Sequence, residues 1–196
     1  LKQLSERKIN QKTLVYLASG PYKKEYESLP VDKVLLVDYH CFPSRKKYRG
    51  IRVPSSNKVT CLGMDALEAI DFFKKNEIKI DILAIINEGT AEGGGYMPLN
   101  VNYVLSYITP TLSEEYIHIL NSQYYDKGLH VNLDLPIEKK LLSKDDVGWI
   151  DPSIFSEDWG KDAEVFRVKK KPSLIEITLN PNIRTLVIHD TIWNYY

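Results

Sequence analysis

The sequence has few cysteines, no long apolar run and no excess of charge of either sign. Cys41 and Cys61 are its only cysteines, and neither belongs to a CxxC or Cys/His cluster. This argues against a structural zinc site and favours a reducing, cytoplasmic setting. No apolar run approaches the roughly 20 residues that span a bilayer, so we expect no membrane segment. The 26 basic and 26 acidic side chains cancel, which leaves no overall field to attract nucleic acid.

Motifs of the commoner catalytic centres are also missing. The four histidines are scattered and form no HxxxH or His/Cys set, and GxSxG is absent. We therefore expect neither a metal site nor a Ser-His-Asp site. Residues 93–96 read GGGY, but no Lys-Ser/Thr pair follows them as in a P-loop. This glycine run is interpreted as a flexible lid or a linker.

Short, continuous apolar runs are what the sequence does have. They are rich in β-forming residues and are interrupted by turn or polar residues, which predicts strands buried on both faces, as in a parallel sheet. The predicted strands are 13–19 (TLVYLAS), 33–38 (KVLLVD), 58–64 (KVTCLGM), 80–86 (IDILAII) and 116–120 (YIHIL).

Helical patterns separate several of these strands. A short polar helix is expected over 22–29 (YKKEYESL), and the segment 41–57 is expected to be a loop. Apolar residues at positions 66, 69, 70 and 73 predict a helix over 65–77, with Asp65 and Glu68 placed as a near capping box. A further helix within 100–112 is expected to end before Pro110.

The pattern changes after residue 120. Segments 130–136, 164–179 and 184–193 resemble strands joined without long helices, and 143–164 reads as a loop, so an antiparallel portion is expected. The order of elements predicts a doubly wound, mostly parallel α/β sheet with antiparallel C-terminal strands. At 196 residues the chain is expected to form one domain over 1–196.

Small and polar residues follow the first four predicted strands. In a doubly wound sheet, ligands bind outside the carboxyl ends of the strands, where the strand order reverses. A glycine there lets the backbone approach a ligand, and an acid about 20 residues later is suitably placed to accept hydrogen bonds from ribose hydroxyls. These strand-end pairs are Ser19-Gly20, Asp38-Tyr39, Met64-Asp65 and Asn87-Glu88.

The segments LASGP (17–21), LLVDY (35–39), LGMDA (62–66) and IINEG (85–89) resemble, in this order, the Rossmann-like S-adenosylmethionine-dependent methyltransferases. The resemblance implies that S-adenosylmethionine is bound by Ser19, Gly20, Asp38, Tyr39, Met64 and Asp65. It also implies that Asn87 and Glu88 open the substrate and catalytic loop. An antiparallel pair of last strands is usual in that family and agrees with the pattern after residue 120. The acceptor substrate is not indicated.

Each of these positions also has a structural interpretation. Gly20-Pro21 forms a plain turn as readily as a ligand loop. Asp38 either caps backbone amides or holds a ligand, since an acid directly after VLLV is costly to bury unpaired. Asp65 is a natural N-cap, and the Asn87-Glu88 pair is a natural turn.

Three functions follow. The leading one is a methyltransferase that uses S-adenosylmethionine as a small-molecule cofactor. The alternative is a cofactor-free Rossmann-like interaction or scaffolding module, favoured by Gly20-Pro21-Tyr22 where the family has two or three glycines. A dinucleotide-dependent oxidoreductase is the third and least favoured function, because the GxGxxG motif of dinucleotide-binding proteins is absent. Nucleic acid is a less favoured partner, supported only by the basic, aromatic-interleaved RKKYR (45–49).

Overall fold

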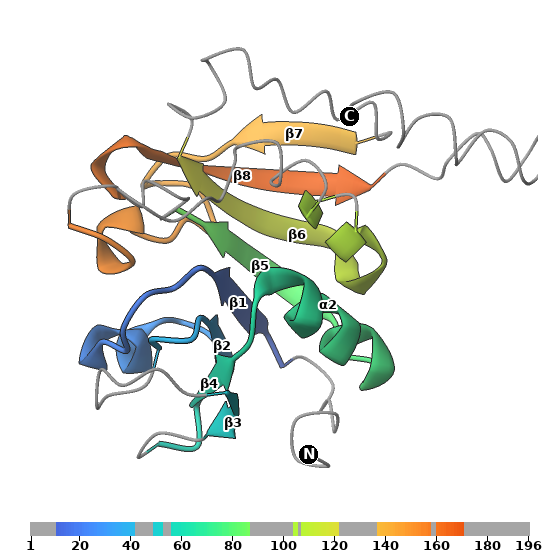
Figure 1. Cartoon of the computed structure of the whole chain (residues 1–196). Helices are drawn as coiled ribbons and strands as arrows, with labels where there is room; N and C mark the ends of the chain where they lie inside the picture. The colour runs from blue at the N-terminus through green and yellow to red at the C-terminus, as the bar shows by residue number, and fades with distance from the viewer. Residues whose placement is uncertain are drawn as a thin grey trace, which may run out of the picture.

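In the computed structural model, eight strands within the described residues form one twisted sheet, in the order β3-β4-β2-β1-β5-β6-β8-β7 (Figure 1). The structure describes residues 11–41, 49–52, 56–86, 104–105, 107–121, 137–157 and 160–170. The last predicted strand (184–193), the predicted strand 130–136 and the glycine run 93–96 lie outside these residues. Among the described helices none is long and apolar enough to cross a membrane.

The middle of the sheet is parallel, as the continuous apolar runs predict. Its strands pair in parallel from β4 through β2, β1 and β5 to β6, with one shift of register between β5 and β6 at Ile80–Ile82. The side chains of β1 and β4 are buried along their whole length, which is why these runs lack an alternating polar face. The strands are β1 (Thr13–Leu17), β2 (Lys33–Val37), β4 (Val59–Gly63), β5 (Ile80–Ile85) and β6 (Leu112–Asn121).

Antiparallel strands complete both edges. At one edge β8 (Ala163–Lys170) lies between β6 and β7 (Ile137–Leu141) and is antiparallel to both, which confirms the expected antiparallel C-terminal portion. At the other edge the three-residue β3 (Gly50–Arg52) pairs with β4. Neither β3 nor β7 was predicted, because one is very short and the other, IEKKL, is too polar to show a buried strand pattern.

The connections cover the two faces of the sheet in the manner of a doubly wound fold. The α-helix α2 (Ala66–Lys75) buries Ala69, Ile70 and Phe73 against one face. Residues 104, 105, 107 and 108 are helical on the same face, followed by the 3-10 helix η2 (Thr109–Thr111), so the helix does end before Pro110.

The short helix expected over 22–29 is present as the 3-10 helix η1 (Lys24–Ser28), which is polar except for Tyr26. The Tyr26 side chain is fully buried against the opposite face of the sheet. A short 3-10 helix is enough to connect the strands here because the buried Tyr26 ring anchors it to the sheet. This ring packs edge-on against Tyr16 and at a tilted angle against Phe155. Segment 143–164 is irregular, as predicted, apart from the short 3-10 helices η4 (Pro152–Ile154) and η5 (Gly160–Asp162) and the first residues of β8.

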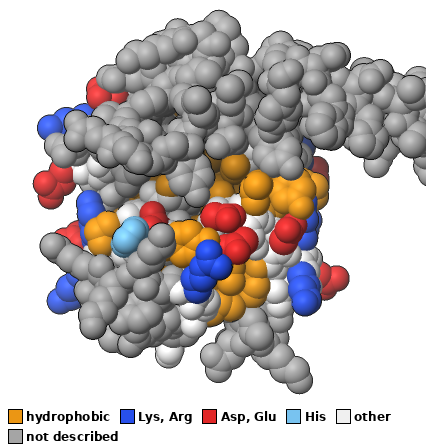
Figure 2. Space-filling model, in the orientation of Figure 1, with side chains coloured by type: hydrophobic (Ala, Val, Ile, Leu, Met, Phe, Trp, Pro, Cys, Tyr) orange, Lys and Arg blue, Asp and Glu red, His pale blue; other side chains and the backbone are white. Residues whose placement is uncertain are grey.

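Alternate residues of each central strand enter two separate apolar clusters. On β1, Leu14 and Tyr16 join the cluster with Tyr26 and Phe155, whereas Val15 and Leu17 join the cluster under α2. The central strands therefore lie between two covered faces of the sheet. Their carboxyl ends lie together along one side of the sheet, the carboxyl-end edge. The described surface in Figure 2 mixes acidic, basic and apolar side chains without a broad area of one charge, in keeping with the balanced sequence.

Candidate functional site

The strand order reverses between β1 and β5. The chain proceeds from β1 outward to β2 and β4, then crosses back to β5 on the other side of β1. Open α/β sheets bind ligands outside the carboxyl ends of the strands at such a reversal, which here lies between β1 and β5. The turns after β1, β2 and β4 all lie at this edge, since these strands are parallel and in register.

The turn after β1 is bent by two residues in the left-handed region. Ala18 has φ of 53° and Gly20 has φ of 62°. Ser19 between them is buried, and its hydroxyl donates to the carbonyl of Gly20 at 3.1 Å. A Cβ atom on Gly20 would meet no described atom within 4 Å. The backbone angle at position 20 therefore favours glycine, and no described residue occupies the space beside it.

Asp38 links this turn to the turn after β2. Its Oδ2 accepts a hydrogen bond from the Gly20 N–H at 3.1 Å, and its Oδ1 accepts one from the His40 N–H at 2.7 Å. The backbone-capping interpretation of Asp38 is therefore confirmed. The half-buried carboxylate has about four acceptor positions, and these two bonds occupy two of them. A ligand role for Asp38 stays a prediction.

The turn after β4 carries the capping box that the sequence predicts. Asp65 Oδ1 accepts from the Glu68 N–H at 2.8 Å, and Glu68 Oε2 accepts from the Asp65 N–H at 3.1 Å. The N-cap interpretation of Asp65 is confirmed. Its other oxygen makes no hydrogen bond within the described residues. Met64, next to it, is half-buried against the cluster under α2.

Glu68 connects Asp65 to Tyr39, a link that sequence reasoning missed. The Tyr39 hydroxyl donates to Glu68 Oε2 at 3.0 Å, and the Arg49 guanidinium lies 5.5 Å from the centroid of the Tyr39 ring. The Asp65 N–H and the Tyr39 hydroxyl together lower the pKa of Glu68. The same hydrogen bond raises the pKa of Tyr39. The sequence indicated Glu68 only as a capping residue. Its contact with Tyr39 joins residues 29 positions apart, and a local sequence pattern does not reveal such a contact.

The structure thus brings together Ser19, Gly20, Asp38, Tyr39, Met64 and Asp65 at one edge of the sheet. Asn87 and Glu88 lie outside the described residues, directly after the buried end of β5. No group of three His, Cys, Asp or Glu side chains in the described part of the chain could hold a metal ion. His118 is fully enclosed on β6, away from this edge.

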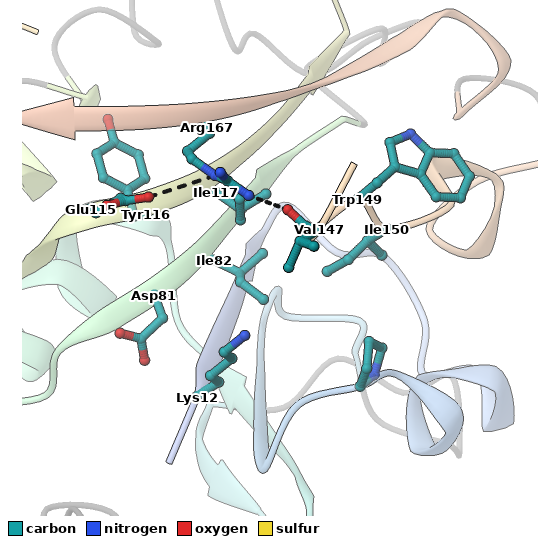
Figure 3. Close-up of a pocket in the computed structure, with 12 residues that line it drawn as sticks. Lys12, Asp81, Ile82, Glu115, Tyr116, Ile117, Val147, Trp149, Ile150 and Arg167 are labelled. Atoms are coloured by element: carbon teal, nitrogen blue, oxygen red, sulfur yellow. Dashed lines mark hydrogen bonds and ion pairs between the residues drawn. The ribbon is translucent and has the colours of Figure 1, made fainter. Parts of the chain in front are cut away.

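A cavity of about 380 Å³ lies elsewhere, near the amino ends of β1 and β5 (Figure 3). Arg167 spans it, with Nε 3.6 Å from Glu115 Oε1 and Nη2 donating to the Val147 carbonyl. Trp149 forms the opposite wall, and Ile82 and Ile117 lie between. The cavity contains none of the predicted site residues. The cavity lies at the amino ends of the parallel strands, whereas a doubly wound fold binds its ligands at their carboxyl ends.

No family model matches the sequence, and no curated protein matches it. Solved structures are similar in fold. A candidate S-adenosylmethionine-dependent methyltransferase from Streptococcus mutans is 14% identical, with a TM-score of 0.48 over 85% of this chain and 46% of that one. A second candidate methyltransferase from that organism, in complex with S-adenosylhomocysteine, is 9% identical, with a TM-score of 0.49 over 87% of this chain and 94% of that one.

Spermidine synthase from Thermotoga maritima is 12% identical, with a TM-score of 0.42 over 94% of this chain and 61% of that one. This chain spans less than half the length of the first of the three proteins. At such identities and TM-scores these comparisons carry no inference about the activity of this chain. The Rossmann-like assignment itself rests on the strand order and on the antiparallel β8 between β6 and β7.

Proposed function

We propose that this chain is an S-adenosylmethionine-dependent methyltransferase acting on an unidentified acceptor. The observation that carries the proposal is the reversal of strand order between β1 and β5. The predicted cofactor residues follow β1, β2 and β4, whose parallel pairing puts the three turns on the same side as this reversal, where a doubly wound fold binds ligands. The sequence alone predicted the same residues, from their positions after separate apolar runs.

Asp38 is the central residue of the proposed site. Its bonds to the Gly20 and His40 amides fix both carboxylate oxygens in place before any ligand arrives. The two remaining acceptor positions suit the paired hydroxyls of a ribose, which would donate to them. A carboxylate held in this way loses little conformational freedom on binding, which favours affinity.

The neighbouring turns supply the other contacts of the proposal. Gly20, with open space beside its Cα, allows the backbone to approach the amino-acid end of the cofactor. The second oxygen of Asp65 is suited to accept from the amino group of an adenine, while its first oxygen caps α2. Tyr39 and Met64 offer apolar surfaces beside the base. Each residue keeps its structural bonds in this arrangement.

Methyl transfer asks little of side-chain chemistry. A lone pair on the acceptor forms a bond to the methyl carbon as the bond from carbon to the sulfonium sulfur breaks, and a proton leaves the acceptor when it carries one. Alignment and exclusion of water supply most of the rate for such a step. Asn87 and Glu88, after β5, are the proposed groups for orienting the acceptor and receiving that proton.

The alternative is a cofactor-free interaction or scaffolding module. One observation favours it: both oxygens of Asp38 already bind backbone amides, so the residue has a structural role without any ligand. The Gly20-Pro21 pair also favours this alternative, because Gly-Pro is a common turn sequence that needs no ligand.

Ligand-dependent stability separates these functions. The thermal midpoint would be measured with S-adenosylmethionine, S-adenosylhomocysteine, NAD and NADP in turn. A ligand at 100 times its dissociation constant adds about 2.7 kcal/mol to the free energy of unfolding. We expect stabilisation by the two sulfur nucleosides alone. Stabilisation by a nicotinamide cofactor would support the oxidoreductase, and no stabilisation by any of the four would support the scaffold.

A further inference from the structure

The only two cysteines of the chain, 20 positions apart, meet inside the fold. Cys61 lies on β4, and Cys41 ends the turn after β2, the strand that pairs with β4. Both side chains are fully buried in the same apolar cluster. The Cys61 thiol donates to the Cys41 carbonyl at 3.1 Å, and the Cys41 thiol lies 3.8 Å from the Leu62 carbonyl. Each thiol thus contacts the backbone of the other's segment.

Cys41 and Cys61 are thus in contact within one buried cluster. A hydrogen bond with the Cys61 thiol, together with burial, raises the pKa of the Cys41 thiol. Both cysteines are free in the structure. The Cys61 sulfur lies 3.1 Å from the main-chain oxygen of Cys41 itself, so side-chain rotation and a small local shift are what a disulfide, with its S–S bond of about 2.05 Å, would require.

Several bonds hold Cys41 in this position independently of its side chain. Its N–H donates to the Asp38 carbonyl at 3.3 Å, and its carbonyl accepts from the Tyr22 N–H at 3.0 Å. The Asp38 N–H in turn donates to the Leu62 carbonyl at 3.1 Å, on β4. The fold itself therefore keeps the two cysteines together.

We propose that Cys41 and Cys61 form a reversible intramolecular disulfide in the folded protein, a covalent clamp between the turn after β2 and strand β4. The thiolate of one cysteine attacks a small-molecule disulfide and displaces one of its thiols. The second cysteine then attacks the mixed disulfide and displaces the other. Two protein thiols and one small disulfide become one protein disulfide and two small thiol groups, so electrons and protons balance.

Burial controls the rate of this exchange and not its equilibrium. The thiols are shielded, so exchange requires the turn at 38–41 to open briefly. The position of equilibrium depends instead on how well the fold aligns the two sulfurs. The proposal stands whether or not the neighbouring edge binds a cofactor.

The test compares the folded and the unfolded chain at redox equilibrium. Protein would be incubated to constancy in mixtures of reduced and oxidised dithiothreitol, with and without urea, then alkylated and weighed by mass spectrometry. The chain has no other cysteine, so each oxidised monomer must carry this disulfide. We expect the oxidation equilibrium constant to be at least tenfold larger in the folded protein, equivalent to about 30 mV.

Cys41→Ser and Cys61→Ser are the matched controls. Neither can form the intramolecular bond, and both should stay reduced or give only dimers. In the wild-type protein the oxidised form should show slower hydrogen exchange at the amides of His40 and Cys41. An equilibrium constant no larger in the folded protein than in urea would overturn the proposal, because it would mean that the fold does not align the sulfurs.

Discussion

At the scale of single residues, Asp38 has an observed structural role and a proposed ligand-binding role. Its carboxylate accepts backbone N–H groups from the turns after β1 and β2. These bonds explain why an acid directly after a buried strand is tolerated, since hydrogen bonding offsets the cost of desolvation. They also hold the carboxylate between these two turns, where the proposed ribose would lie. The two roles can be separated by experiment.

Replacing Asp38 by alanine should weaken binding of S-adenosylhomocysteine at least tenfold, because hydrogen bonds to a charged group contribute about 1.5–3 kcal/mol. The same change should lower the free energy of unfolding by about 1–3 kcal/mol, because the Gly20 and His40 amides lose their acceptor. Calorimetric titration well below the melting temperature would measure the affinity, and urea unfolding the stability.

Asp32→Ala is the control for this variant. Asp32 Oδ2 also accepts a backbone N–H, that of Lys12 at 2.7 Å, but it precedes β2 and lies at the opposite end of that strand. The Asp32→Ala variant should be less stable than the wild type but should bind S-adenosylhomocysteine with the same affinity. If Asp38→Ala binds as tightly as the wild type, Asp38 is structural alone.

At the scale of elements, α2 shows how local sequence fixes a helix boundary. Asp65 and Glu68 satisfy each other's backbone N–H groups, and Lys74 and Lys75 lie in the last turn, where positive charge favours the helix dipole. The apolar residues of α2 repeat with helical period and are the ones buried against the sheet. This element was therefore predictable from ten neighbouring residues. Its side-chain link to Tyr39 on another turn was not.

Asp65→Ala should destabilise the protein by about 1 kcal/mol through loss of the N-cap. Urea unfolding would measure this, and hydrogen exchange at the first amides of α2 should become faster. Asp65→Ser is the matched variant, since serine also caps helices well but carries no carboxylate. It should keep most of the stability and, under the proposed function, still bind S-adenosylhomocysteine less tightly. Equal stability loss in both variants would contradict the capping role.

At the scale of the whole molecule, one buried histidine makes the fold sensitive to acid. His118 lies on β6 between Leu83 of β5 and Phe166 of β8 and is 2% exposed, with no hydrogen-bond partner for Nε2 in the described part of the chain. Burial, and to a lesser extent the charge of Lys139, lowers the pKa of His118 from 6.5 to about 3. Between these two pH values the His118 imidazole is therefore protonated in the unfolded chain and neutral in the folded chain.

The free energy of unfolding should therefore fall as the pH falls below 6.5, down to about pH 3. This histidine alone should contribute a loss of about 2 kcal/mol between pH 7 and pH 5. His118→Leu, which cannot titrate and leaves no unpaired nitrogen, should lose about 2 kcal/mol less over the same interval. Urea unfolding at the two pH values would measure both. An identical loss in the variant would show that other groups cause the acid sensitivity.

Local pattern determined the central elements of this protein. The apolar runs gave β1, β2, β4, β5 and the core of β6, and the helical repeat gave α2, because propensity, periodicity and capping act over a few neighbouring residues. The strand-end positions of Gly20, Asp38 and Asp65 follow from the same runs. Their roles as acceptor, cap and turn residue were foreseen as alternatives, and the structural role was found for Asp38 and Asp65.

Only the tertiary structure decided which of these residues meet. It pairs Asp38 with the Gly20 amide, brings Cys41 to Cys61, and joins Tyr39 to Glu68, across 18, 20 and 29 positions. It also makes a strand of the polar segment 137–141 by placing it against β8, and a 3-10 turn of 24–28 by burying Tyr26. Such pairings depend on strand register and on packing between distant segments, which no local window of sequence contains.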